Sequence, residues 1–415
     1  MTSVQNRLPQ LSGNKWLIIV IAAVVFGACS PKVRPVAPHP PVEQRVEQPK
    51  PEKPAVKLPA RTSVIALLLP FGLDHLTSNP GYSSTGLGQA YLALDYYQGF
   101  KLALDSLTGK GFNYKVQLFD TKGTIAQAHA LANNPQVKTS DLIVGPVFAD
   151  DLKAFTTTLI TAHKPILSPL APSDPAVFKN ASLITAIPPL EVHAWAAAQY
   201  AIKAFKPQRV FILKSGYSEE NGYITPFKKA IDSLGKKHIA VRQLTVVRGQ
   251  LSSIIPQLSA TGQNVFVVPS TSQQFLSVTL RTLDSLAAIY PVVVIGHPNW
   301  QKFAFLSIDQ LQRLNTYITG SDKVNYKATA TTNFIDDYRE AYHLEPSDYA
   351  IKGFDEGMYF GALLGKNAGE LKGLDKDSFE GLHNSFNFTY KSGLGWVNTH
   401  VNIYHYSNFD LKKVE

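Results

Sequence analysis

Cysteine is almost absent from this chain: Cys29 is the only one among 415 residues. A single thiol forms no intramolecular disulfide bond and supplies too few ligands for a cysteine-based metal site. Long apolar runs are also scarce. The run near the N-terminus, residues 16–26, is about half of the ~20 residues that a membrane-spanning helix needs. These absences argue against a disulfide-stapled domain and against a transmembrane helix as a permanent anchor.

Motifs of the common catalytic machineries are missing as well. The sequence contains no Gly-x-Ser-x-Gly, no His-Glu-x-x-His, no glycine-rich phosphate loop with a lysine and no Gly-x-Gly-x-x-Gly. His400 and His405 are five residues apart near a terminal strand, which puts them on opposite faces, unlike a metal-binding pair. We therefore expect no enzyme activity, no cofactor and no metal site.

The N-terminus has the order of a secretory signal peptide. Arg7 and Lys15 precede the apolar run 16–26, and small residues follow it directly before Cys29. This pattern predicts a signal peptide over residues 1–28.

The four residues at the end of this leader resemble the lipobox of bacterial lipoproteins. They are Phe26, Gly27, Ala28 and Cys29, with Phe26 where leucine is usual. The resemblance implies lipidation of Cys29 and attachment to a membrane of the cell envelope. Ser30 after the cysteine, in place of aspartate, implies the outer membrane, facing the periplasm.

A segment rich in proline, lysine, valine and glutamate follows, and residues 29–61 read as a disordered tether behind the lipidated cysteine. It shows no apolar periodicity, so it has no apolar face to offset the entropy lost on ordering. Of the net charge of +9, the leader carries two positive charges and residues 30–61 carry four, which leaves three for the rest. This small excess gives no support for a nucleic-acid partner.

From residue 62 the chain alternates between short apolar runs and amphipathic stretches, as in α/β proteins with parallel sheets. About 350 residues exceed what one core usually supports, which favours two lobes. The expected strands are 64–71, 114–120, 141–145 and 165–168, then 209–213, 240–245, 264–268, 291–295 and 402–406. The expected helices are 92–107, 124–133, 150–163, 193–205, 223–234, 251–258, 272–289, 333–342 and 355–364, with Asp355 and Glu356 at a helix start.

Several runs resemble those of type I periplasmic-binding proteins. They are IALLLPF at 65–71, GF at 99–100, LALD at 102–105, IVGP at 143–146 and PILSP at 165–169. Their order and spacing are similar to those of the branched-chain amino-acid-binding proteins of ABC importers and of lipoprotein activators of penicillin-binding proteins. The resemblance implies two Rossmann-like lobes with parallel sheets, joined by a three-strand hinge. Residues 62–187 and 328–374 would form lobe 1, and residues 188–327 and 375–415 lobe 2.

Ligand-binding residues are expected in the loops that follow the strands, because these loops face the cleft between such lobes. The resemblance places Pro172 where amino-acid binders hold the ligand carboxylate with a threonine. Proline has neither a hydroxyl nor an N–H, which argues against an amino-acid ligand. The candidate residues are Phe148, Ala149, Asp150, Leu170, Ala171, Ser173, Tyr217, Ser270, Thr271, His297, Asn299 and Trp300.

Each candidate could also have a purely structural role, and the sequence does not decide between that role and ligand binding. Asp150 and the serine and threonine residues suit helix N-caps. The loop 296–300 has the most ligand-like composition, with an exposed Trp300 that stacks on a solute beside His297 and Asn299. Trp300 could equally plug the end of the lobe.

Two functions are consistent with this pattern. One is a tethered receptor that binds a small solute in the interlobe cleft, as the substrate-binding proteins of ABC transporters do, with an ABC permease as its partner. The other is a lipoprotein that docks or activates a cell-wall synthase. The polar loops that converge on the cleft favour the receptor.

Overall fold

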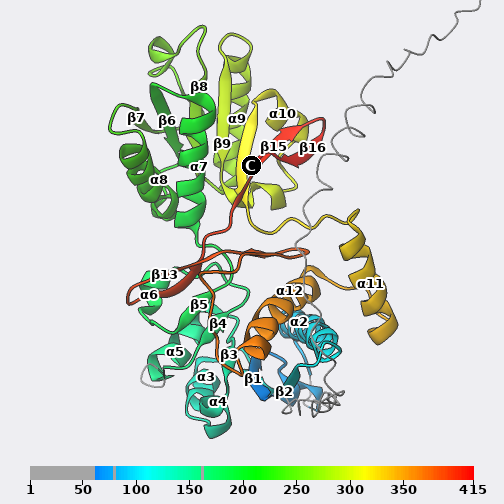
Figure 1. Ribbon diagram of the computed structural model, residues 1–415. Helices are drawn as coiled ribbons and strands as arrows, with labels where there is room; N and C mark the ends of the chain where they lie inside the picture. Colours follow the sequence, from blue (N-terminus) through cyan, green and yellow to red (C-terminus); the bar gives the residue numbers. More distant parts are fainter. Residues whose placement is uncertain (1–60, 78–80, 160–162) are drawn as a thin grey trace, which may run out of the picture. The chain divides into compact units, whose positions relative to one another are not determined.

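The computed structural model describes residues 61–77, 81–159 and 163–415 (Figure 1). The predicted signal peptide, Cys29 and the tether up to residue 60 lie outside these described residues. All described residues belong to one compact unit. No helix among them is both long and apolar enough to cross a membrane.

The first sheet has seven strands in the order β13-β14-β5-β4-β3-β1-β2. All neighbours are parallel except β13 and β14, which form an antiparallel hairpin. Strand β1 lies between β3 and the edge strand β2 and is almost fully buried, as its continuous apolar run predicts. The strands are β1 (Thr62–Leu69), β2 (Asn113–Asp120), β3 (Leu142–Val144), β4 (Ile166–Ser168), β5 (Leu183–Thr185), β13 (Phe388–Lys391) and β14 (Gly395–Asn398).

Helices cover both faces of this sheet. Alternate residues of β1 point to opposite faces, so Ile65 and Leu67 belong to a core with α2 and α12, whereas Ala66 and Leu68 pack with α3 and α5. The helices are α2 (Ser84–Thr108), α3 (Ile125–Ala132), α4 (Pro135–Thr139), α5 (Ala149–Leu159), α6 (Pro175–Phe178), α11 (Thr329–Tyr342) and α12 (Asp348–Lys366).

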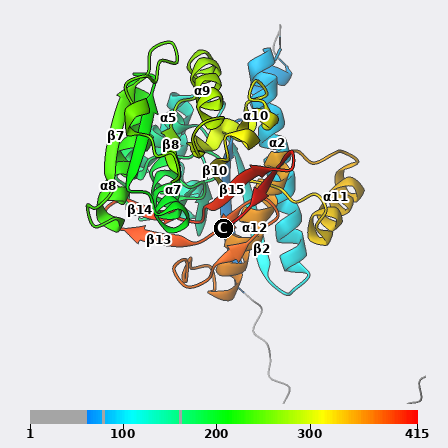
Figure 2. The same ribbon diagram turned by 90° about the horizontal axis from the view of Figure 1, so that it is seen from above.

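Helices α2 and α12 lie side by side (Figures 1 and 2), and glycines line their contact. A Cβ atom on Gly99 would overlap the carbonyl oxygen of Ala350, and one on Gly353 would overlap that of Tyr96. One turn further along, a Cβ on Gly357 would lie 2.7 Å from the Cβ of Ala103. The close approach of the two backbones therefore depends on the missing side chains.

The second sheet has seven strands in the order β16-β15-β10-β9-β8-β6-β7. Neighbours from β10 to β7 are parallel, and β15 and β16 are antiparallel additions at one edge. Its helices are α7 (Leu190–Phe205), α8 (Asn221–Leu234), α9 (Gln273–Ala287) and α10 (Ile308–Arg313). The strands are β6 (Arg209–Lys214), β7 (Ala240–Thr245), β8 (Asn264–Val268), β9 (Val292–Gly296), β10 (Thr316–Gly320), β15 (Asn402–Ser407) and β16 (Asp410–Lys413).

The chain passes between the two sheets at residues 186–189, 321–328 and 399–401. The predicted α/β class, with two mostly parallel sheets, is confirmed. The expected position of residues 388–398 in the second lobe is wrong. These residues form β13 and β14, and Trp396 of β14 pairs with Ile184 of β5 in the first sheet.

Several expected helices differ from the observed ones. Helix α2 begins at Ser84 and not at residue 92, and α11 begins at Thr329 and not at residue 333. Residues 251–258 contain only a 3-10 turn at Ile255–Gln257, because Pro256 donates no backbone hydrogen bond and disfavours helical geometry at the residue before it. Helix α12 begins at Asp348, about two turns before the expected start, so Asp355 and Glu356 are buried inside it.

Both carboxyls have buried partners. Asp355 accepts hydrogen bonds of 2.7–2.8 Å from the backbone N–H groups of residues 382–384, next to the small hairpin of β11 (Phe379–Glu380) and β12 (Ser385–Phe386). The Tyr96 hydroxyl donates a 2.6 Å hydrogen bond to Glu356. Burial raises the pKa of Glu356 well above its ordinary value, which favours a neutral carboxyl at this helix contact.

Candidate functional site

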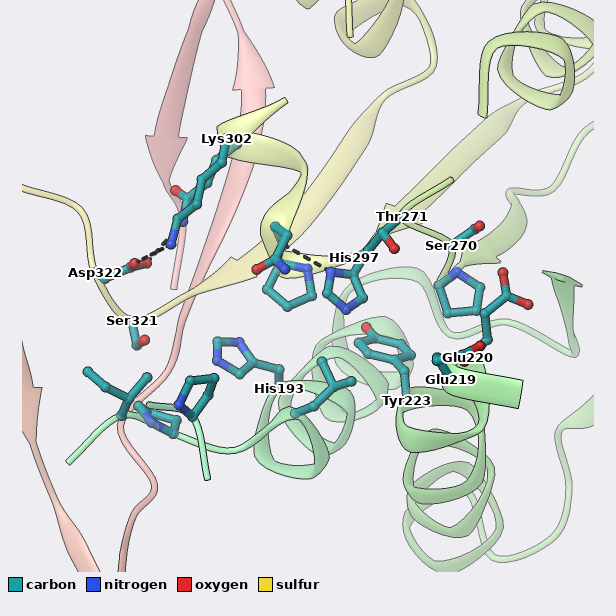
Figure 3. A pocket seen from close by; sticks show the side chains of 18 of the residues that line it. His193, Glu219, Glu220, Tyr223, Ser270, Thr271, His297, Lys302, Ser321 and Asp322 are labelled. Carbon is teal, nitrogen blue, oxygen red and sulfur yellow. Dashed lines mark hydrogen bonds and ion pairs between the residues drawn. The ribbon is translucent and has the colours of Figure 1, made fainter. Parts of the chain in front are cut away.

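A cavity of about 720 Å³ is lined by residues that follow strands of both sheets and by residues of the crossing segments. Its volume falls within the range of about 300–1,000 Å³ that is typical of small-molecule sites. Leu170, Pro172, Ile187 and Pro188 form an apolar wall next to the first sheet. Most of the polar lining comes from the loops and helices of the second sheet (Figure 3).

The structure brings half of the predicted residues together at this cavity. Their strands end at the same edge, so loops far apart in sequence meet there. Those that line it are Leu170, Tyr217, Ser270, Thr271, His297 and Asn299.

Most of the other predicted residues have local roles elsewhere. Phe148 is half-buried and packs against the core of the first sheet. Ala149 and Asp150 are exposed in the first turn of α5, where a carboxylate favours the helix dipole. The Ser173 hydroxyl lies 3.3 Å from that of Ser168, and Ala171 accepts a hydrogen bond from the backbone of Ser173.

The expected exposure of Trp300 is wrong. Its side chain is 1% exposed and packs in the core of the second sheet. The indole N–H donates a 2.9 Å hydrogen bond to the carbonyl oxygen of Ser270. The ring also lies so close to Gly296 that a Cβ atom there would overlap it. Trp300 therefore holds the loop after β9 against the loop after β8, behind the cavity wall.

His297 caps the 3-10 helix Pro298–Lys302 and faces the cavity (Figure 3). Its Nδ1 atom accepts a 3.1 Å hydrogen bond from the backbone N–H of Asn299. Burial lowers the pKa of this imidazole to about 4, so the ring is neutral at pH 7. Because Nδ1 accepts, the proton of the neutral ring is on Nε2, which makes Nε2 a donor.

Two buried residues in the middle of the cavity wall were not predicted. His193, near the start of α7, lines the cavity together with His297. Its Nδ1 atom lies 3.0 Å from the Thr319 hydroxyl. Tyr223 of α8 is fully buried, and its hydroxyl has no hydrogen-bond partner among the described residues. An unpaired buried hydroxyl is costly. Because Tyr223 is 0% exposed, a solute reaches this hydroxyl only if the side chains around it move.

Charged residues also line the cavity. Asp322 follows β10 and accepts hydrogen bonds from Lys302 Nζ at 3.1 Å and from Gln301 Nε2 at 3.0 Å. Burial is the largest single effect and opposes its ionisation, but Lys302, His383 and Lys352 together outweigh it, so the pKa of Asp322 lies below its ordinary value. Lys352 enters from α12, and Glu219 and Glu220 from the loop after β6. The described residues contain no cluster of three or more histidine, cysteine, aspartate or glutamate side chains that could hold a metal ion.

The family model described as periplasmic binding protein matches residues 82–389, about three quarters of the chain. The chain belongs to the periplasmic-binding-protein family. This match confirms the resemblance inferred from the sequence runs. No curated protein sequence matches the chain significantly.

Solved structures show the same fold at low sequence identity. A putative branched-chain amino acid ABC transporter protein from Rhodospirillum rubrum has a TM-score of 0.60 and 13% identity over 85% of this chain and 100% of that one. An ABC transporter substrate-binding protein from Desulfitobacterium hafniense, in complex with Leu, has a TM-score of 0.54 and 16% identity over the same shares of the chains. The cavity thus occurs in a periplasmic-binding-protein fold.

The buried imidazole of His193 predicts a pH dependence of stability. Burial lowers its pKa from 6.5 to about 4. The unfolded chain takes up a proton below pH 6.5 and the folded chain does not, so stability is full above pH 6.5 and is lost as the pH falls toward 4. Between pH 7 and pH 5 the wild type should lose about 2 kcal/mol more than His193→Gln.

Chemical denaturation of both proteins at the two pH values checks this expectation. His297 and His383, which burial also leaves with a pKa of about 4, are present in both proteins, so the difference isolates His193. Equal losses in the two proteins would show that His193 is protonated or solvated in the folded state.

Proposed function

We propose that this periplasmic-binding protein is a receptor of the cell envelope that binds a small solute in the cavity of Figure 3. The observation that carries the proposal is a cavity large enough for a solute, with the Nε2 donor of His297 in its lining and the buried, unpartnered hydroxyl of Tyr223 beside that imidazole. Hydrogen-bond donors without protein acceptors, in a mainly apolar enclosure, are typical of ligand sites.

The three crossing segments support two lobes that move about a hinge. We propose residues 62–187 and 328–398 as lobe 1, and residues 188–327 and 402–415 as lobe 2. The cavity lies beside the crossings, with Ile187, Pro188 and Ser321 in its lining. A solute that contacts residues of both lobes would favour the closed arrangement by its higher affinity for it.

The relative from D. hafniense was solved with leucine, and delivery of a solute to an ABC permease is the corresponding role for this chain. Pro172 argues against the same ligand. It is exposed at the cavity and offers neither a hydroxyl nor an N–H to a carboxylate. Because Pro172 offers no contact to a carboxylate, a second function remains to be tested, that of a lipoprotein that docks a cell-wall synthase. The receptor binds a solute in the cavity, whereas the docking protein does not use the cavity.

Filling the cavity distinguishes them. Thr271 has an exposed side chain on the cavity lining, so Thr271→Trp should leave the fold intact and occupy the solute's space. A solute at 100 times its Kd stabilises the folded state by about 2.7 kcal/mol, which is a rise in Tm of several °C. We expect a panel of amino acids, peptides, sugars and a low-molecular-weight envelope extract to contain a solute that raises the Tm of the wild type but not of Thr271→Trp.

Thr261→Trp is the matched control, because Thr261 is exposed in a loop of the same part of the chain and lies outside the cavity lining. It should respond to the solute as the wild type does. If nothing in the panel shifts the wild type, or if Thr271→Trp responds equally, the docking function replaces the receptor.

Membrane attachment through Cys29 is part of the same proposal, supported by the lipobox-like residues before it. Cys29→Ala removes the thiol that would be acylated, so the variant should appear as an uncleaved precursor or move to the aqueous phase of a detergent phase partition. The wild type should stay in the detergent phase, because acyl chains add about 0.8 kcal/mol of membrane affinity per buried methylene. An acylated variant in the detergent phase would refute lipidation at Cys29.

A further inference from the structure

The lysine end of the cavity carries an excess of positive charge. Among the lining residues at this end, Lys302 and Lys352 share a single carboxylate, that of Asp322, whose two oxygens already accept hydrogen bonds from Lys302 and Gln301. Lys352 is half-buried and forms no ion pair with any described residue. Burial lowers its pKa and Lys302 adds to that effect, whereas Asp322, Glu356 and Asp348 oppose it. An ammonium group in this position is stabilised by an anionic group of a ligand.

The opposite end of the cavity is acidic. Glu219 and Glu220 lie across the rings of His193, His297 and Tyr223 from Lys302 and Asp322 (Figure 3). The carboxylate of Glu220 is buried and accepts hydrogen bonds from the Ser215 hydroxyl at 2.7 Å and from the Ser215 backbone at 3.0 Å. Glu219 is exposed and forms no ion pair within the described residues. This end favours a cationic group of a ligand.

The middle of the cavity is neutral and offers a donor. The Nε2 atom of His297 supplies an N–H group for which no protein acceptor is found among the described residues, and the fully buried ring of Tyr223 lies behind it. Leu170, Ile187 and Pro188 supply the apolar wall. Carbonyl oxygens with small apolar groups beside them fit such a lining, and a peptide backbone has both.

We propose that the cavity binds a short peptide-like solute in an extended conformation, with its terminal carboxylate at Lys352, a carbonyl group at His297, and its amino end at Glu219. The inference rests on the proposed function and specifies the class of its ligand. A free α-amino acid carries its ammonium and carboxylate groups on one carbon atom, so it cannot reach both charged ends. An extended peptide separates them by about 3.3–3.6 Å for each residue.

The test uses the full chain in detergent and four probes. These are a pool of tripeptides with free termini, the same pool with amidated C-termini, the same pool with acetylated N-termini, and the free amino acids. Binding is measured by equilibrium dialysis with mass spectrometry of the retained peptides, followed by calorimetry on those retained. We expect members of the free-termini pool to bind, and amidation or acetylation to weaken their binding at least about tenfold, because each removes a charge-assisted contact.

Lys352→Met connects the effect to this residue. It should weaken the retained peptides at least about tenfold and abolish the preference for the free acid over the amide, because the charge that distinguishes them is gone. Lys366→Met is the control, since Lys366 is exposed in the last turn of the same helix and outside the cavity. It should leave both affinities unchanged.

Several results would overturn the inference. They are equal binding of acid and amide, unchanged affinity in Lys352→Met, and binding of free amino acids or another solute in place of peptides. In these cases a solute still binds, so the receptor function survives and only the ligand class fails. If no probe binds and no solute of any kind raises the Tm, the receptor function fails with it.

Discussion

Trp300→Ala should reduce the free energy of unfolding by about 3–5 kcal/mol, the usual cost of emptying a buried aromatic site. The indole is 1% exposed, and its N–H is the partner of the Ser270 carbonyl oxygen, which the substitution would leave unsatisfied. The backbone at Gly296 lies directly against the ring, so its removal leaves a cavity that the surrounding backbone fills only in part. Urea denaturation of the unliganded protein measures the effect.

Trp300→Phe is the matched control. It keeps an aromatic ring in the core but removes the hydrogen bond, so its loss should be clearly smaller than that of alanine. A loss below about 1 kcal/mol for Trp300→Ala, the size usual for surface positions, would mean that the side chain is accessible. In that case the stacking role first assigned to Trp300 would return.

Gly99→Ala should be strongly destabilising, by about 3 kcal/mol or more, or should prevent folding. Its new methyl group would overlap the carbonyl oxygen of Ala350, so α2 and α12 would have to separate along their whole glycine-lined contact. Helix propensity acts in the opposite direction, since alanine is favoured over glycine by about 1 kcal/mol in a helix. A large loss can therefore arise only from the close helix contact.

Gly88 provides the control in the same helix. A Cβ atom there meets nothing within 4 Å, so Gly88→Ala should raise the free energy of unfolding by up to about 1 kcal/mol. Denaturant unfolding of both variants gives the comparison. Similar behaviour of the two would show that α2 and α12 do not pack as closely as described.

Much of the secondary structure could be predicted from local sequence patterns. The apolar run 64–71 predicts the buried strand β1, and the expected strands 240–245 and 264–268 coincide with β7 and β8. The apolar runs of β1 and β8 identify strands because a strand covered on both faces has no solvent-facing side to vary, whereas the edge strand β7 shows the alternation of a partly exposed strand. The position of β13 and β14 is different. These strands are short, and the pairing of β14 with β5 joins residues about two hundred positions apart, which no local pattern encodes.

The site was predictable where it depends on strand ends. Ser270, Thr271 and His297 follow β8 and β9 directly, so their loops had to reach the same edge of the sheet. His193 and Tyr223 lie within helical patterns, where a cavity-facing side chain looks the same as a core-facing one. For Trp300 the prediction failed in the opposite direction. The composition of its loop is typical of a ligand site, but the ring is buried because it packs in the core of the second sheet, which the local sequence does not reveal.

Native mass spectrometry of the full chain, purified from its own envelope in mild detergent, tests the solute-binding cavity most directly. The wild type and the Thr261→Trp control should retain a non-covalent small molecule beyond any covalent lipid. Thr271→Trp, whose new side chain occupies the cavity, should have lost it. Absence of the small molecule from the wild type, or its equal retention by Thr271→Trp, would contradict a receptor that holds its solute between the ends of the two sheets.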